Sequence, residues 1–242
     1  MANYGHIVNS FPLRMSLGCY PWLFYPLYSL VPINRQLAVN PTTELVIEGF
    51  PRSANTFAVL AFEHSQSREV SIAHHMHVPA QIIRAAYWKI PTLVLVRKPQ
   101  DAIASYVMRK SQLSLEDALK CYIRFYTIVL RYTESYVTAS FEEVTSNFSA
   151  VVERINQKFG TQFVTLTPTG EDLEQIFERT NNIAQRNGMG EMGIARPSAE
   201  RNTRKQELIS ELQSPKYQAL LGAAKDIYLE FHHRGLLAGI TP

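Results

Sequence analysis

A short loop at residues 49–57 combines residue types that bind phosphate. It reads GFPRSANTF and follows the apolar run 43–50, whose length and β-branched content predict a buried parallel strand. Residues 57–64 have helical character, so the order is strand, loop, helix. That order points backbone N–H groups and a helix N-terminus at one spot, and such a spot attracts an anion.

The loop differs from that of nucleoside triphosphatases, which reads GxxxxGK[ST]. Ala54 occupies the position of the second glycine and Asn55 that of the lysine. No strand ending in Asp, which such enzymes need for Mg²⁺, is evident. A P-loop kinase is therefore the less favoured alternative.

A second segment, VRKPQDAIASY at residues 96–106, follows the clearest predicted strand, 92–97. Pro99 suits the first turn of a helix. Arg97 leaves the strand end and Ser105 lies two turns into that helix, so a guanidinium and a hydroxyl could converge on one phosphate.

These segments resemble those of the P-loop-type sulfotransferases, which use 3′-phosphoadenosine 5′-phosphosulfate, in a short, bacterial-like form. Residues 50–57 resemble the family's 5′-phosphosulfate loop, [Y/F]-P-[K/R]-S-G-[T/N]-T-[W/F], with Ala54 in place of the usual Gly. Residues 96–106 resemble its 3′-phosphate segment, V-R-[N/D]-P-x-D-x-x-x-S-Y. Residues 75–79, HMHVP, more weakly resemble K-T-H-x-P, whose histidine is the family's base.

The resemblance implies a role for each matching residue. His77 would take the acceptor's proton, with His75 as second choice, and Arg52 would stabilise the charge that develops on the leaving oxygen. The residues implied to hold the cosubstrate are Arg52, Ser53, Ala54, Asn55, Thr56, Phe57 (near the adenine), Arg97 and Ser105. This scheme requires no metal, although His74, His75 and His77 leave a zinc cluster open as an alternative.

The family's C-terminal motif, R-K-G-x-x-G-D-W, is not present in this sequence. Arg196, Ser198 and Arg201, with Lys205 nearby, are the candidates to replace it, on basic character and position. The missing motif and Ala54 together keep a second alternative open, an inactive nucleotide-binding protein of the same fold.

Composition bounds the remaining possibilities. The 242 residues suit one large α/β domain, and a net charge of +3 is too small to indicate nucleic-acid binding. Two cysteines, Cys19 and Cys121, predict a reducing compartment, here the cytoplasm. Prolines interrupt the apolar segment 17–33, so no transmembrane span is predicted there. We expect this segment to be an arm packed on the domain; the alternative is a surface that contacts a membrane or a lipid-like acceptor.

The predicted architecture is a single α/β domain with a doubly wound, mostly parallel sheet and helices on both faces. Further strands are expected at 70–76 and 137–141, and helices at 81–89, 98–110, 114–136 and 148–159. The chain divides into an N-terminal arm (1–40), a cosubstrate-binding core (43–160), a flexible loop or lid (181–203) and C-terminal helices (204–242). The predicted function is transfer of a sulfuryl group to a hydroxyl or amine of a small-molecule, glycan or lipid-like acceptor, which the sequence does not identify.

Overall fold

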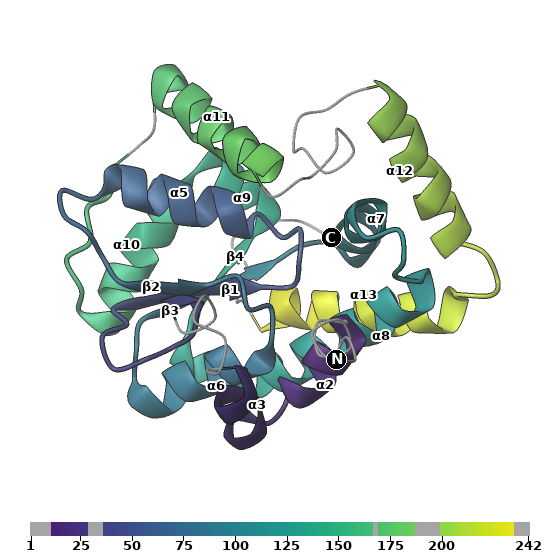
Figure 1. Ribbon diagram of the computed structural model, residues 1–242, viewed down its shortest axis with the longest axis horizontal. Helices are drawn as coiled ribbons and strands as arrows, with labels where there is room; N and C mark the ends of the chain where they lie inside the picture. The colour runs from purple at the N-terminus through teal and green to yellow at the C-terminus, as the bar shows by residue number, and fades with distance from the viewer. Residues whose placement is uncertain (1–10, 29–35, 167–168, 187–198, 235–242) are drawn as a thin grey trace, which may run out of the picture.

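The computed structural model describes residues 11–28, 36–166, 169–186 and 199–234. Within these ranges the strands form one four-stranded sheet in the order β2-β1-β3-β4, and every neighbouring pair is parallel (Figure 1). The strands are β1 (Leu45–Gly49), β2 (Ile72–His74), β3 (Thr92–Val96) and β4 (Val137–Ser140).

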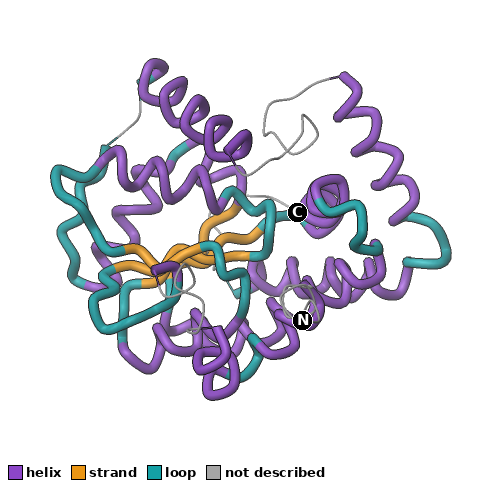
Figure 2. The backbone as a smooth tube through the Cα atoms, in the orientation of Figure 1, coloured by secondary structure: helices purple, strands orange, loops and turns teal. Residues whose placement is uncertain are grey.

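Helices make the crossovers that parallel strands require. One helix joins each of the first two strand pairs, and two helices and a 3₁₀ turn lead from β3 to β4 (Figure 2). In chain order these elements are α5 (Asn55–Ser65), α6 (Pro79–Trp88), α7 (Pro99–Arg109), α8 (Leu115–Val129) and η1 (Leu130–Ser135). The doubly wound α/β architecture predicted from the sequence is confirmed.

Helices cover both faces of the sheet. Successive side chains of each strand point to opposite faces, so both faces are apolar and need cover. Leu45 and Ile47 of β1 pack with α5, α10 (Phe148–Phe159) and α11 (Gly170–Arg186), whereas Val46 packs on the opposite face with α6. Figure 1 shows α5, α10 and α11 above the sheet, and α6, α8 and α13 (Gln218–His233) below it. All five β1 residues are buried, as expected for a central parallel strand.

Two predicted elements are shorter than expected. Strand 70–76 is reduced to β2, which ends at His74. Helix 114–136 ends at Val129, because the chain tightens into η1 and Tyr132 leaves the helical region. A helix missed from the sequence, α9 (Phe141–Ser146), follows β4 directly, where Ser140 forms a capping box with Glu143.

The predicted loop 181–203 is helical at both ends. Residues 181–186 belong to α11 and residues 199–203 begin α12 (Ala199–Leu212), whereas 187–198 lie outside the described residues. The expected break near Pro215 separates α12 from α13.

The N-terminal arm is helical where it is described. The helices α2 (Phe11–Leu17) and α3 (Pro21–Tyr28) bury Met15 and Phe24 completely, while Trp22 stays 74% exposed. Pro21 begins α3, a position where proline is favoured. In the described part of the chain no helix has the length and apolar character needed to cross a membrane.

Candidate active site

The candidate site lies where the sheet reverses its winding direction. From β1 the chain crosses to β2 on one side, and β3 lies on the other side, so the loops after β1 and β3 diverge at this edge. Ligands of doubly wound sheets bind in such a crevice. A cavity of about 600 Å³ opens there. Gly49 ends β1 so close to β3 that an added Cβ would lie 2.5 Å from the Leu95 carbonyl oxygen, which explains why glycine stands here.

The loop after β1 is a tight turn with two left-handed residues, closed by a side-chain hydrogen bond. Arg52 and Ala54 have φ angles of 71° and 69°, in the left-handed region that glycine adopts most easily. Glycine would hold this conformation at position 54 at less cost than Ala54 does. The Asn55 side chain donates from Nδ2 to the Phe50 carbonyl at 3.1 Å and closes the loop. Ser53 is completely buried and is not among the residues that line the cavity.

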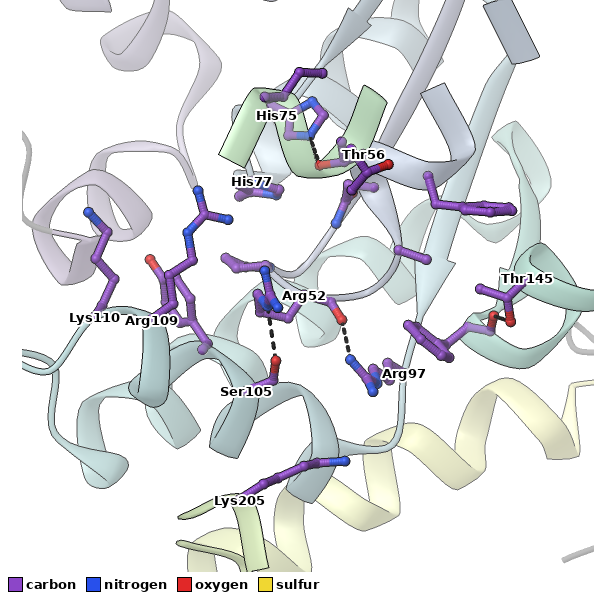
Figure 3. A pocket seen from close by; sticks show the side chains of 18 of the residues that line it. Arg52, Thr56, His75, His77, Arg97, Ser105, Arg109, Lys110, Thr145 and Lys205 are labelled. Carbon is purple, nitrogen blue, oxygen red and sulfur yellow. Dashed lines mark hydrogen bonds between the residues drawn. The ribbon is translucent and has the colours of Figure 1, made fainter. Parts of the chain in front are cut away.

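Three predicted residues join the two segments (Figure 3). Arg52 donates from Nε to Ser105 Oγ at 2.9 Å, and the Arg97 guanidinium donates to the Arg52 carbonyl at 2.7 Å. Arg97 also lies over the Phe141 ring, 3.8 Å from its centroid. The two segments that the sequence assigns to different phosphates therefore meet at one cavity.

The cavity lining is strongly cationic. Among the described residues that line it there is no Asp or Glu. Burial, and then the charges of Arg201, Arg109 and Arg97, lower the pKa of Arg52 to about 9. Because crowded cations in a partly dry cavity are costly without counter-charge, the arrangement favours a bound anion. The cationic lining residues are Arg14, Arg52, Arg97, Arg109, Lys110, Arg201 and Lys205, the last of which is ion-paired with Asp101.

A buried carboxylate shapes the histidine turn that follows β2. Glu48 is fully buried, and its carboxylate accepts hydrogen bonds from the backbone N–H groups of Met76 (2.7 Å) and His77 (3.0 Å). His75 and His77 have φ angles of 59° and 53°, so they stand in a left-handed turn. β2 ends at His74, before both histidines, so a turn and not a strand brings them to the cavity.

The two histidines differ in which nitrogens are engaged. His77 Nδ1 lies 2.8 Å from the Gly49 carbonyl, which can only accept, so Nδ1 carries the proton and Nε2 keeps its lone pair. Burial, followed by the charge of Arg14, lowers the pKa of His77 to about 3. In His75, Nε2 is hydrogen-bonded to Thr56 Oγ1 at 3.0 Å and Nδ1 meets His74 Nδ1. In the described chain no three His, Cys, Asp or Glu side chains are grouped so as to hold a metal ion.

An aromatic pair closes the cavity on the side of α11. Phe57, expected near the adenine, lies with its ring centroid 5.6 Å from that of Phe177. Thr180 and Ile183 of the same helix also line the cavity. Sequence reasoning missed α11, although Ile176, Thr180 and Ile183 repeat at helical spacing.

The structure brings together most of the predicted site. Arg201 lines the cavity, whereas Arg196 and Ser198 lie outside the described residues. Three cations were missed: Arg14 of α2, Arg109 of α7 and Lys110, which follows α7. Arg109 stands four residues after Ser105, so the spacing on one helix face was the available signal. No comparable signal pointed to Arg14.

Comparisons with known proteins add a structural likeness. No protein-family model matches the chain, and no curated protein matches it. Among solved structures, the chain is similar to mouse sulfotransferase SULT7A1 complexed with PAP, at 13% identity and a TM-score of 0.39, covering 81% of this chain and 91% of that one. At so low a TM-score the likeness carries no argument about function. The residues of the cavity carry that argument instead.

Proposed function

We propose that the chain is a sulfotransferase that moves a sulfuryl group from 3′-phosphoadenosine 5′-phosphosulfate to an acceptor. The observation that carries the proposal is the junction of Arg52, Ser105 and Arg97 at one cationic cavity. It joins a 5′-phosphate loop to a second basic segment, as recognition of a nucleotide with two separate phosphate groups requires. A nucleotide with a single phosphate chain would need only the first.

The Arg52 guanidinium is suited to stabilise the negative charge of the leaving group. Its Nε is engaged by Ser105, while its two Nη atoms have no hydrogen-bond partner among the described residues. Those atoms are available to the oxygen that bridges phosphorus and sulfur, where negative charge develops during transfer. A bound anion also counters the neighbouring positive charges that depress the pKa of Arg52.

The reaction then needs one nucleophile and one base. The acceptor oxygen attacks sulfur in line, the bond between sulfur and the bridging oxygen breaks, and the electron pair leaves with the 5′-phosphate of the nucleotide. The acceptor proton passes to His77 Nε2, which holds a lone pair because Nδ1 donates to the Gly49 carbonyl. His75 is less suited because hydrogen bonds engage both of its nitrogens. Negative charge on the bound cosubstrate raises the pKa of His77 toward the useful range.

Calorimetric titration with 3′-phosphoadenosine 5′-phosphate, AMP and ATP tests the donor site. A charge-assisted contact is worth about 1.5–3 kcal/mol, so the 3′-phosphate should tighten binding over AMP by roughly tenfold or more. Equal affinities for AMP and the 3′-phosphorylated nucleotide would mean that Arg97 and Ser105 do not hold a phosphate. Tighter binding of ATP would favour a kinase.

A further inference from the structure

The cations of the cavity fall on two sides of Arg52. Figure 3 shows Arg97 and Lys205 on one side, and Arg109 and Lys110 on the side of His77. Burial is the largest cause that lowers the pKa of His75 and of His77, and the charge of Arg109 adds to it in both, which agrees with this division. The histidine side therefore holds positive charge of its own.

The cations on the histidine side have no acidic partners. In the described chain, the Arg109 and Lys110 side chains form no hydrogen bond or ion pair, and the buried Arg14 Nε lacks a hydrogen-bond partner. By contrast, Lys205 is paired with Asp101, and Arg97 is bonded to the Arg52 carbonyl. Surface cations without acidic partners are common, but Arg14, Arg109 and Lys110 converge on one cavity that no acid lines among the described residues.

The cosubstrate accounts for the charges on the other side of Arg52. In the proposed function, the 3′-phosphate lies at Arg97 and Ser105, the 5′-phosphate at the loop, and the sulfuryl group next to His77. What lies beyond His77 must then be the acceptor. A site whose described lining has three cations and no carboxylate would bind a neutral acceptor poorly, because the cations would lose water without gaining a partner.

We propose that the acceptor is an anion, a hydroxyl compound whose carboxylate, sulfate or phosphate group is bound by Arg109 and Arg14 while its hydroxyl faces His77 Nε2. This inference rests on the proposed function and names its substrate class. A bidentate contact from Arg109 would also orient the acceptor for in-line attack. The acceptor's negative charge would offset the Arg14 and Arg109 charges that weaken His77 as a base.

Binding without turnover gives the first test. Protein saturated with 3′-phosphoadenosine 5′-phosphate is titrated with benzoate and with its neutral counterpart benzamide, by ligand-observed NMR. We expect benzoate to bind with a Kd of about 1–10 mM, a weak but measurable affinity, and benzamide at least tenfold more weakly. Arg109→Gln should abolish the difference and Arg109→Lys should keep part of it. Lys225→Gln, which removes an exposed cation of α13 outside the cavity lining, is the matched control and should change nothing.

Turnover gives the second test, with 4-hydroxybenzoate against 4-hydroxybenzamide and D-glucuronate against D-glucuronamide as acceptors. We expect kcat/KM to favour each carboxylate by roughly tenfold or more, and Arg109→Gln to reduce that ratio toward one. If the nucleotide binds but benzoate does not, or if Arg109→Gln keeps the benzoate preference, the anionic acceptor is refuted and the donor site stands. If the 3′-phosphorylated nucleotide itself does not bind, the proposed function fails, and this inference with it.

Discussion

Replacing Tyr126 by Phe removes one oxygen atom from beneath the candidate site. The Tyr126 hydroxyl is fully buried on α8, donates to the Leu95 carbonyl at 2.7 Å and accepts from the Phe50 N–H at 3.3 Å. One hydroxyl therefore ties the end of β3 to the first residue of the phosphate loop. Tyr126→Phe keeps the ring and leaves two buried backbone groups without this partner.

An unsatisfied buried backbone group costs about 1–3 kcal/mol, and the loss is partly offset because a hydroxyl no longer has to be buried. A net loss of about 1–3 kcal/mol lowers Tm by roughly 2–12 °C in a domain of this size. The loop amides are also less well held, so about 1 kcal/mol, roughly fivefold, should appear in the Kd for 3′-phosphoadenosine 5′-phosphate.

Tyr136→Phe is the matched control. Its hydroxyl is also buried and donates to the Val129 carbonyl at 3.1 Å, at the end of α8 and outside the cavity lining. Urea unfolding should show a stability loss of about 1 kcal/mol, and calorimetry should show an unchanged nucleotide affinity. The reasoning is refuted if Tyr126→Phe binds the nucleotide as tightly as the wild type, or if Tyr136→Phe weakens binding equally.

Three further outcomes follow from the site. His77→Ala should leave nucleotide affinity nearly unchanged and lower kcat on the order of 10²–10⁴-fold, whereas a normal rate would move the base to His75. Arg97→Ala should weaken the binding of the 3′-phosphorylated nucleotide by about 1.5–3 kcal/mol and the binding of AMP by less, as paired calorimetric titrations would measure. Burial raises the pKa of Glu48 to about 7, so the folded state binds a proton on this carboxyl more tightly than the unfolded state does. The stability that this proton contributes is complete below about pH 4.5 and is lost as the pH rises through 7. Urea unfolding between pH 5 and 8 measures how the free energy of unfolding falls with rising pH. Glu48→Gln should remove the part of this fall that Glu48 causes, and an unchanged pH dependence would assign it to another group.

The sheet and the position of the loop after β1 were predictable because local sequence signals agree with the fold. Strand 92–97 is apolar from residue 93 to residue 96 and lies in the interior of the sheet, and the observed β3 differs from it by one residue. The loop after β1 was located from its residue types and from the order of predicted strand, loop and helix around it. Ser53 shows the limit of such matching, since a pattern does not say which side chains turn inward.

Other parts of the site depend on contacts distant in sequence. Arg14 reaches the cavity only because α2 packs against α8 and the core around it, and no local pattern encodes that packing. The histidine turn depends on Glu48 in the neighbouring strand. A carboxylate inside an otherwise apolar strand was a visible irregularity in the sequence, but its partners lie 28 and 29 residues further along the chain.

The left-handed residues have a consequence for any attempt to make this protein more heat-resistant. Within the described residues, the non-glycine positions with positive φ are Arg52, Ala54, His75, His77 and, away from the cavity, Lys89. Each holds a conformation that costs a side-chain-bearing residue about 1–2 kcal/mol and glycine much less. Selection for thermal tolerance alone would thus enrich glycine at Arg52 and His77, where the proposed chemistry needs a guanidinium and an imidazole. Thermal stability and the proposed catalysis therefore favour different residues at Arg52 and His77. A stabilising glycine substitution should be made at Lys89 instead.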